Sequence, residues 1–371
     1  MQGALPAVRP TLTSGELAWL ATQQDVESRL VFSQVDGDTT HYQVKHGPFE
    51  NDILSSLPRR NWTLLVQDVD KHLPDFRALF AAVNFIPDWR IDDLMVSFAA
   101  PGGGVGPHRD NYDVFLCQGE GTREWRLGDG DTCVADLSSS DLQLVKPFAD
   151  PEARIDRTGD VLYLPPGIPH WGIARDFCMT YSIGMRAPTL AELNAGLARL
   201  FDLRDGVAAR SSATGSEVFY ADPDLEAHEA APGLISDAAI GRTRKLLPAE
   251  IALDDRQIGM LLGSVVTDPK AWLEPEGVAS DEIAATIRKL AQFGDLSIHG
   301  MSQLAFYASA ASNLVFANGC VLQVEPAELL FFRDICKYRT TSGAELCANA
   351  GPELLHWLLS SGVIDLTRLP E

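Results

Sequence analysis

The sequence has few cysteines, and no two of them stand at the C-x-x-C spacing that favours a metal or redox pair. The six are scattered along the chain, at Cys117, Cys133, Cys178, Cys320, Cys336 and Cys347. A chain of 371 residues can bury a large core without covalent cross-links. We therefore expect reduced thiols rather than disulfides, as in a cytoplasmic protein.

Targeting and membrane signals are also missing. The N-terminal stretch lacks the basic segment and apolar run of a signal peptide. The longest apolar-looking stretch, residues 304–324, contains Ser309, Ser312, Asn313 and Asn318. Because these polar side chains interrupt it, no membrane-spanning helix is predicted there.

Positive charge is scarce: 30 Lys and Arg stand against 51 Asp and Glu, a net charge of −21. Such a chain repels nucleic acid and anionic lipid, and a basic protein or peptide is its natural partner. The alternative is that the charge serves only solubility. The composition is otherwise that of a globular protein, and the length favours two or three domains.

Short β-rich runs fill residues 91–190, and Gly, Pro and Asp separate them at close intervals. No long helical period fits between the runs, which is typical of an antiparallel sandwich or barrel. Before them, residues 60–70 predict a strand and residues 73–89 a helix. After them, leucines at helical spacing predict a helix over residues 189–203.

The last third of the chain is mainly helical, but Asn318-Gly319 between two apolar runs predicts a tight hairpin. Helical patterns precede the hairpin, over residues 283–290 and 302–310, and follow it over residues 326–339. Helices and a hairpin together indicate a winged-helix-like module. Residues 211–371 hold 22 acidic and 11 basic residues, a net charge of −11 (11 − 22). We therefore expect protein contact or a structural role rather than direct DNA binding.

A candidate metal site begins at His108 and Asp110, directly after a glycine-rich run. Side chains two apart on an extended segment project to the same side. With one more imidazole they would form the 2-His-1-carboxylate triad, which leaves positions on Fe(II) open for a chelator and O₂. The pair alone is weak evidence, since a surface His beside an Asp is common.

The third candidate ligand is His170, within GDVLYLPPGIPH over residues 159–170. The strand and the proline-rich loop that follows it match the G-x₅-P-x-G-x₂-H spacing of a cupin barrel. A stiff loop of this kind presents one imidazole inward. A satisfied structural histidine is the alternative, but the stereotyped loop makes it less attractive.

An arginine is the best candidate to hold the far carboxylate of a chelating 2-oxoglutarate. If residues 119–121 form a three-residue hairpin loop, Cys117 faces Arg123 and Phe115 faces Trp125. Arg123 then lies on an apolar, inward face and needs an anion. An internal ion pair with a nearby carboxylate is the alternative. Ser97, inward on the preceding strand, is a possible second donor or a small polar filler.

Four stretches together resemble the bacterial Jumonji-C ribosomal oxygenases: PGGGVGPHRDNYDVF, QGEGTREWRLG, LYLPPGIPH and YSIGMRAP. The resemblance covers nearly the whole chain. It implies an α+β protein in which a double-stranded β-helix (a cupin or Jumonji-C barrel) precedes a helical dimerisation region and a winged-helix-like domain. The implied boundaries are residues 1–205, with a core at 91–190, then 206–265 and 266–371.

The resemblance also implies a function, the hydroxylation of an arginine β-carbon in a basic protein of the large (50S) ribosomal subunit. Fe(II) is the implied cofactor, with 2-oxoglutarate and O₂ as co-substrates, and a homodimer is the implied assembly. By motif, His108, Asp110 and His170 would bind Fe(II), and Ser97 and Arg123 would bind 2-oxoglutarate.

Two residues depart from the usual pattern of the family, Met185 in place of Phe and Trp171 in place of a polar residue. They leave the choice of substrate more open than the chemistry. Asp113 and Asp92 are candidates for holding the target guanidinium. The alternatives are the same chemistry on another target, such as a ribosomal histidine, and a non-enzymatic metal-binding cupin regulator.

Overall fold

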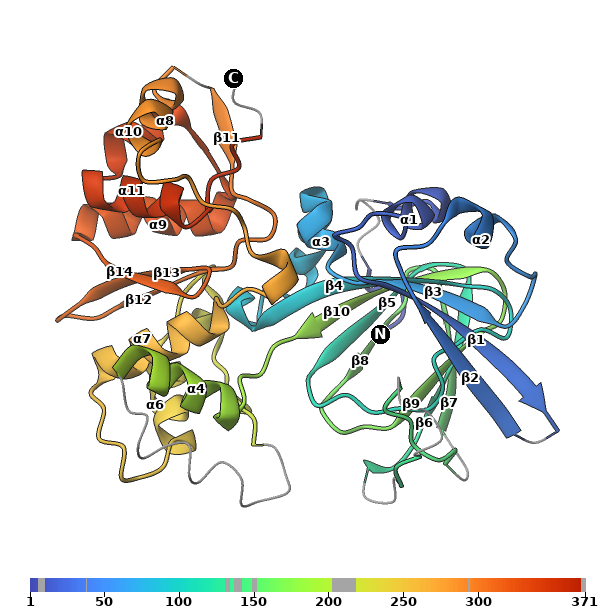
Figure 1. Ribbon diagram of the computed structural model, residues 1–371. Coiled ribbons are helices and arrows are strands. Elements are labelled where there is room, and N and C mark those ends of the chain that lie inside the picture. The colour runs from blue at the N-terminus through green and yellow to red at the C-terminus, as the bar shows by residue number, and fades with distance from the viewer. Residues whose placement is uncertain are drawn as a thin grey trace. The chain divides into compact units, whose positions relative to one another are not determined.

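The computed structural model describes residues 1–5, 11–37, 39–130, 134–136, 142–148, 152–201, 218–292 and 294–367 (Figure 1). The chain divides into two compact units. The first contains residues 1–83 and 91–185, and the second contains residues 84–90 and the chain from Arg186 onward. The expected three-part division of the chain stays a prediction.

The first unit is built on a seven-stranded antiparallel sheet in the order β2-β1-β3-β4-β10-β5-β8 (Figure 1). Its strands are β1 (Ser28–Asp36), β2 (Thr39–His46), β3 (Trp62–Val66), β4 (Ile91–Ala99), β5 (Val114–Glu120), β8 (Val161–Leu164) and β10 (Cys178–Met185). β10 is buried along its whole length. Its small or polar residues, such as Thr180 and Ser182, alternate with the larger Met179, Tyr181 and Ile183, because successive side chains of a strand point to opposite faces.

A second, three-stranded sheet in the order β7-β6-β9 completes the barrel. It contains β6 (Thr122–Leu127), β7 (Glu152–Arg157) and β9 (His170–Ala174). Side chains from both sheets line one cavity. The expected cupin-type barrel with mixed α and β content is therefore confirmed.

The connection between β5 and β6 differs from the predicted hairpin. β5 pairs with β10 and β8, whereas β6 pairs with β7 and β9, so the two strands lie in different sheets. The chain crosses between the sheets at Gly121, whose φ of +69° suits glycine. The predicted pairing of Cys117 with Arg123 and of Phe115 with Trp125 is wrong.

The error reverses the faces of β5 but not those of β6. Val114 and Leu116 line the cavity, while Phe115 packs on Tyr163, with ring centroids 4.9 Å apart. A hairpin signal in the sequence cannot distinguish a turn within one sheet from a crossing between two sheets.

Short helices accompany the barrel. They are α1 (Ser14–Leu20), α2 (Asn51–Ser55), α3 (Val69–His72) and the 3₁₀ segment η1 (Pro74–Val83). Thr13 caps α1 in a capping box with Glu16. The helix predicted over residues 73–89 is thus a 3₁₀ segment, and the short 3₁₀ turn η2 (Asp88–Arg90) follows it in the second unit.

The second unit combines helices with two small sheets. Its α-helices are α4 (Leu190–Phe201), α6 (Asp237–Leu246), α7 (Asp255–Val266), α8 (Ile283–Leu290), α9 (Pro326–Tyr338), α10 (Gly343–Asn349) and α11 (Pro352–Ser360). Its 3₁₀ segments η4 (Ala227–Ala230) and η5 (Ala271–Leu273) are short. Its strands are β12 (Leu304–Ala308), β13 (Asn313–Ala317) and β14 (Cys320–Gln323) in one sheet, and β11 (Asp295–Ser297) with β15 (Thr340–Ser342) in the other.

The predicted hairpin is confirmed, since β13 pairs with β14 around Asn318 and Gly319, both with positive φ. The helix predicted over residues 302–310 is wrong, because this stretch forms β12. Phe306 packs into one core of the unit, whereas Ala305 and Tyr307 pack into another. A strand buried on both faces is continuously apolar, so periodicity cannot distinguish it from a helix.

Two sequence expectations concern the chain as a whole. No helix of the described residues is long and apolar enough to cross a membrane. The five cysteines within the described residues are all free, as expected. Cys133 lies outside the described residues.

Candidate active site

The glycine-rich segment after β4 brings His108 to the inside of the barrel. Gly106 has a φ of +85°, and a Cβ there would lie 2.7 Å from Leu144 and 2.8 Å from the Tyr42 ring. Only glycine suits this approach. His108 and His170 then exchange backbone hydrogen bonds, with N–O distances of 3.0 and 2.8 Å. The two imidazoles are thus fixed side by side at the start of β9.

The proline-rich loop between β8 and β9 delivers His170, as predicted. Gly167 allows the turn with a φ of +83°. Its N–H donates to the carbonyl of Asp110 at 2.8 Å. One loop therefore positions the third predicted ligand and also fixes the backbone of the second.

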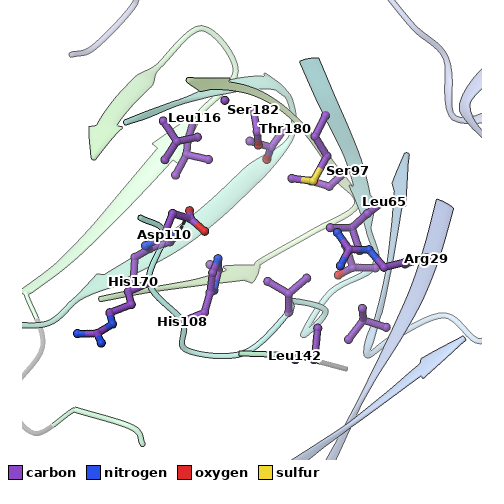
Figure 2. A pocket seen from close by; sticks show the side chains of 18 of the residues that line it. Arg29, Leu65, Ser97, His108, Asp110, Leu116, Leu142, His170, Thr180 and Ser182 are labelled. Atoms are coloured by element: carbon purple, nitrogen blue, oxygen red, sulfur yellow. Dashed lines mark ion pairs between the residues drawn. The ribbon is translucent and has the colours of Figure 1, made fainter. Parts of the chain in front are cut away.

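His108, Asp110 and His170 form a cluster whose ligand atoms all lie within 4.8 Å of one another. His170 Nε2 is 3.6 Å from Asp110 Oδ2, and the two imidazole centroids are 4.2 Å apart. Figure 2 shows the three side chains converging at one side of the cavity. The structure thus brings together the three residues that the sequence singled out, although the first and the last are 62 positions apart in the chain.

The protonation state of both histidines suits metal binding. Nδ1 of His108 lies 3.0 Å from the carbonyl of Gly106, and Nδ1 of His170 lies 3.0 Å from the carbonyl of Ile168. Because a carbonyl only accepts, each Nδ1 carries the proton. Each Nε2 is therefore left with a free lone pair, which is what a metal ion requires.

Burial makes charge unfavourable in this cluster when no metal is bound. Burial, and next the nearby His108, lower the pKa of His170 from 6.5 to about 3. Burial also raises the pKa of Asp110, although His108 and a hydrogen bond with Tyr112 oppose the rise. A divalent cation would compensate both effects, because it favours a neutral imidazole and an ionised carboxylate. The donor set therefore fits a metal ion.

The cluster faces a cavity of about 360 Å³ enclosed by both sheets of the barrel, a volume suited to a small ligand. Arg123 projects into it from β6 and is only 5% exposed. Its guanidinium carbon lies 5.6 Å from the centroid of the Trp125 ring. Its Nη2 donates to the sulfur of Cys178 at 3.7 Å, and its Nε has no hydrogen-bond partner among the described residues. Among the described residues, Arg123 forms no ion pair of the kind considered from the sequence. A buried cation of this kind calls for an anion.

Hydroxyl groups lie on the opposite sheet of the cavity. Ser97 on β4 is directly across from Thr180 on β10, and both are buried. Both line the cavity together with Ser182 (Figure 2). Thr180 donates to the side chain of Gln118 at 3.1 Å. The inward position predicted for Ser97 is therefore accompanied by two hydroxyls that the sequence analysis missed.

The two aspartates predicted for a target guanidinium do not line the cavity. Asp113 accepts a hydrogen bond of 2.6 Å from the exposed Tyr163, and Asp92 accepts one from Lys71 through its backbone. Asp93 and Tyr112 line the cavity instead. The alternation that placed Ser97 inward also places Asp93 inward, four residues earlier on β4, so the sequence contained this signal.

The two departures from the family pattern lie beside the site. Met185 is 1% exposed at the end of β10, and its N–H donates to the carbonyl of Asp113. The Trp171 ring packs 5.0 Å from the guanidinium of Arg126. Neither is among the described residues that line the cavity.

Comparisons of the sequence with known proteins identify one group of relatives. A JmjC domain profile matches residues 78–193. The ribosomal protein uL16 3-hydroxylase of Escherichia coli K12 is 46% identical over 217 residues, which are 58% of this chain and 53% of that protein. A probable ribosomal oxygenase of Haemophilus influenzae is 36% identical over 209 residues, which are 55% of this chain and 50% of that protein. The chain thus aligns with about half the length of these curated relatives.

Solved structures match over a longer range. The crystal structure of Escherichia coli YcfD has a TM-score of 0.70 and 31% identity, and the match covers 98% of this chain and 93% of that chain. YcfD, a ribosomal oxygenase, has also been solved in complex with cobalt and 2-oxoglutarate. That structure matches with a TM-score of 0.66 and 31% identity over the same shares.

Proposed function

The chain belongs to the JmjC-domain ribosomal oxygenases, and we propose that it is an Fe(II)- and 2-oxoglutarate-dependent protein hydroxylase. The observation that carries the proposal is the pairing, in one cavity, of the His108–Asp110–His170 cluster with the buried guanidinium of Arg123. The first is a metal-binding set, and the second has no anionic partner among the residues that the structure describes. The relative solved with cobalt and 2-oxoglutarate supports this combination.

The metal would be held by His108 Nε2, His170 Nε2 and a carboxylate oxygen of Asp110. When bound, Fe(II) supplies the oxidative chemistry, which couples the conversion of 2-oxoglutarate and O₂ to succinate and CO₂ with hydroxylation of a C–H bond. The chain itself binds, orients and excludes water. The two backbone carbonyls that hold Nδ1–H keep both rings in the binding orientation.

The co-substrate 2-oxoglutarate would place its far carboxylate on Arg123, whose fork can donate two parallel hydrogen bonds. Ser97 is the proposed second donor, and Thr180, its cross-strand neighbour, lies next to it. The Trp125 ring and the aliphatic residues Val114 and Leu116 surround the remaining cavity with apolar surface. This surface strengthens the ionic contact because it excludes water.

The proposed substrate is an arginine of a large-subunit ribosomal protein, with uL16 as the first candidate, because a relative 46% identical is a uL16 3-hydroxylase. The net charge of −21 favours a basic partner. Asp93 is 6% exposed and lines the cavity, so its carboxylate is a suitable partner for a target guanidinium. Asp92 and Asp113 stay weaker candidates, since the cavity does not include them.

The remaining expectations complete the proposal. We infer a homodimer, a winged-helix-like module in the second unit that contacts protein rather than DNA, and a cytoplasmic location. The hairpin of β13 and β14 supports a winged-helix-like module. The acidic charge supports contact with protein rather than with DNA. Light scattering and a gel shift at physiological salt would test the assembly and the absence of DNA binding.

The deciding experiment is aerobic incubation of the protein with Fe(II), 2-oxoglutarate and recombinant uL16, followed by peptide mass spectrometry. A gain of one oxygen on a single arginine is expected. Succinate without a modified arginine would support the oxygenase activity but reject an arginine of uL16 as its target. No succinate and no modification would reject the enzymatic function.

A further inference from the structure

A second polar region of the cavity is not used by the metal cluster or the co-substrate residues. It consists of the inward-facing side chains Arg29 on β1 and Thr63 and Gln67 on and just after β3, here called the β1–β3 wall. Arg29 pairs with Leu65, and Leu65 pairs with Ser97. Since neighbouring strands lie about 4.8 Å apart, the backbone of Arg29 is about 10 Å from that of Ser97. Figure 2 shows Arg29 reaching into the cavity from the side opposite the metal cluster.

Each residue of the β1–β3 wall carries a buried polar atom that has no hydrogen-bond partner within the described chain. The atoms are Nε of Arg29, Oγ1 of Thr63 and Oε1 of Gln67. Thr63 is completely buried. Folded proteins pair nearly all such atoms, because an unmade hydrogen bond is costly. Three together on one wall of a ligand cavity therefore indicate a partner that comes from outside the chain.

The chemistry of the three atoms limits the kind of partner. Nε of Arg29 can only donate, Oε1 of Gln67 can only accept, and the Thr63 hydroxyl can do both. A carboxylate could accept from Nε of Arg29, but it would be repelled by Oε1 of Gln67, because both are acceptors. A polypeptide main chain offers both C=O and N–H groups. The C=O and N–H groups of an extended polypeptide repeat every two residues. The inward positions 63, 65 and 67, on and just after β3, repeat with the same spacing.

We propose that the β1–β3 wall binds the main chain of the polypeptide substrate, with Arg29 donating to a peptide carbonyl and Gln67 accepting from a peptide N–H. Thr63 would bond to the next peptide unit along the same line. The substrate backbone would then cross the cavity opposite the metal cluster, so that one side chain points towards the metal. This inference rests on the proposed function, because it requires a protein substrate.

The test measures uL16 binding to the Fe(II)-loaded protein under anaerobic conditions with 2-oxoglutarate present, so that no turnover occurs. Three variants remove the polar atoms and keep the side-chain volume: Arg29→Met, Thr63→Val and Gln67→Met. A hydrogen bond to a charged group is worth enough that Arg29→Met should weaken uL16 binding by about 10- to 100-fold. The other two should weaken it by about threefold or more. Lys45→Met on β2 removes the same charge outside the cavity and serves as the matched control.

Two further measurements separate substrate binding from other roles. The affinity for 2-oxoglutarate, measured by calorimetry, should not change in the wall variants. The melting temperature of the ligand-free variants should stay equal or rise, because Thr63→Val removes an unpaired hydroxyl from the interior. A structural role would lower the melting temperature instead.

The outcomes are distinct. Weaker uL16 binding with unchanged 2-oxoglutarate affinity and an unchanged or higher melting temperature supports the inference. Wild-type affinity for uL16 in all three variants overturns it while the proposed function stands. A loss of 2-oxoglutarate affinity overturns it by assigning the wall to the co-substrate. If uL16 does not bind the wild-type protein, the proposed function fails and the inference fails with it.

Discussion

Replacement of Arg123 by methionine is the sharpest test of the co-substrate site. The guanidinium is buried, and its Nε has no partner among the described residues. If it holds a carboxylate of 2-oxoglutarate, Arg123→Met removes one partner of a buried, hydrogen-bonded charge pair. Such truncations cost about 2–5 kcal/mol. Since each 1.4 kcal/mol is a factor of ten, the dissociation constant should rise about 30-fold to several thousandfold.

The stability of the ligand-free protein should respond differently. In the absence of an anion, Arg123 contributes a weak contact to the Cys178 sulfur and the face of Trp125. Methionine keeps most of the apolar contact and removes the unpaired Nε. We therefore expect the melting temperature without ligand to stay unchanged or rise, while the increase caused by 2-oxoglutarate is lost.

The assay is anaerobic titration calorimetry with 2-oxoglutarate on the Fe(II)-loaded protein, with thermal melts beside it. Arg126→Met is the matched control, because Arg126 lies on the same strand but pairs with Glu124 at 2.8 Å and does not line the cavity. Arg123→Lys keeps the charge but loses the fork and should give an intermediate affinity. An unchanged affinity in Arg123→Met, or an equal loss in Arg126→Met, would show that Arg123 does not hold the carboxylate of 2-oxoglutarate.

Three more predictions concern the site and the stability of the chain. Asp110→Ala or His170→Ala should abolish succinate formation while circular dichroism shows a folded protein, and normal turnover in either variant would contradict the metal assignment. Asp93→Asn should weaken uL16 binding at least tenfold without changing 2-oxoglutarate affinity. Asp92→Asn, outside the cavity, should bind uL16 as the wild type does. Weaker uL16 binding in Asp92→Asn alone would assign the target guanidinium to Asp92 instead. Burial lowers the pKa of His299 below its ordinary value of 6.5, so the unfolded chain binds the proton more readily than the folded one. Stability should fall as the pH drops below about 6.5. The melting temperature of His299→Gln should fall less than that of the wild type over this pH range. An equal fall would show that His299 does not cause the loss of stability.

Local signals in the sequence identified most of the candidate site. The position of each metal ligand depends on the few residues around it. The spacing of His108 and Asp110 and the stiff loop before His170 therefore indicated the ligands. Alternation along β4 placed Ser97 inward, because side chains of a strand alternate regardless of what surrounds it. The same alternation also places Asp93 inward, although Asp93 was not among the predicted site residues.

Which strands are neighbours could not be predicted from the sequence, because it depends on how distant segments pack. β5 and β6 follow each other directly yet lie in different sheets, so the faces predicted for Cys117 and Phe115 were wrong. The stretch at residues 302–310 became β12 because cores on both sides buried it, and burial depends on the partners rather than on the stretch itself. The unpaired atoms of Arg123 and of the β1–β3 wall likewise became visible only in three dimensions. A sequence specifies what each side chain can bond to, but whether a partner is present depends on segments that folding brings together from distant parts of the chain.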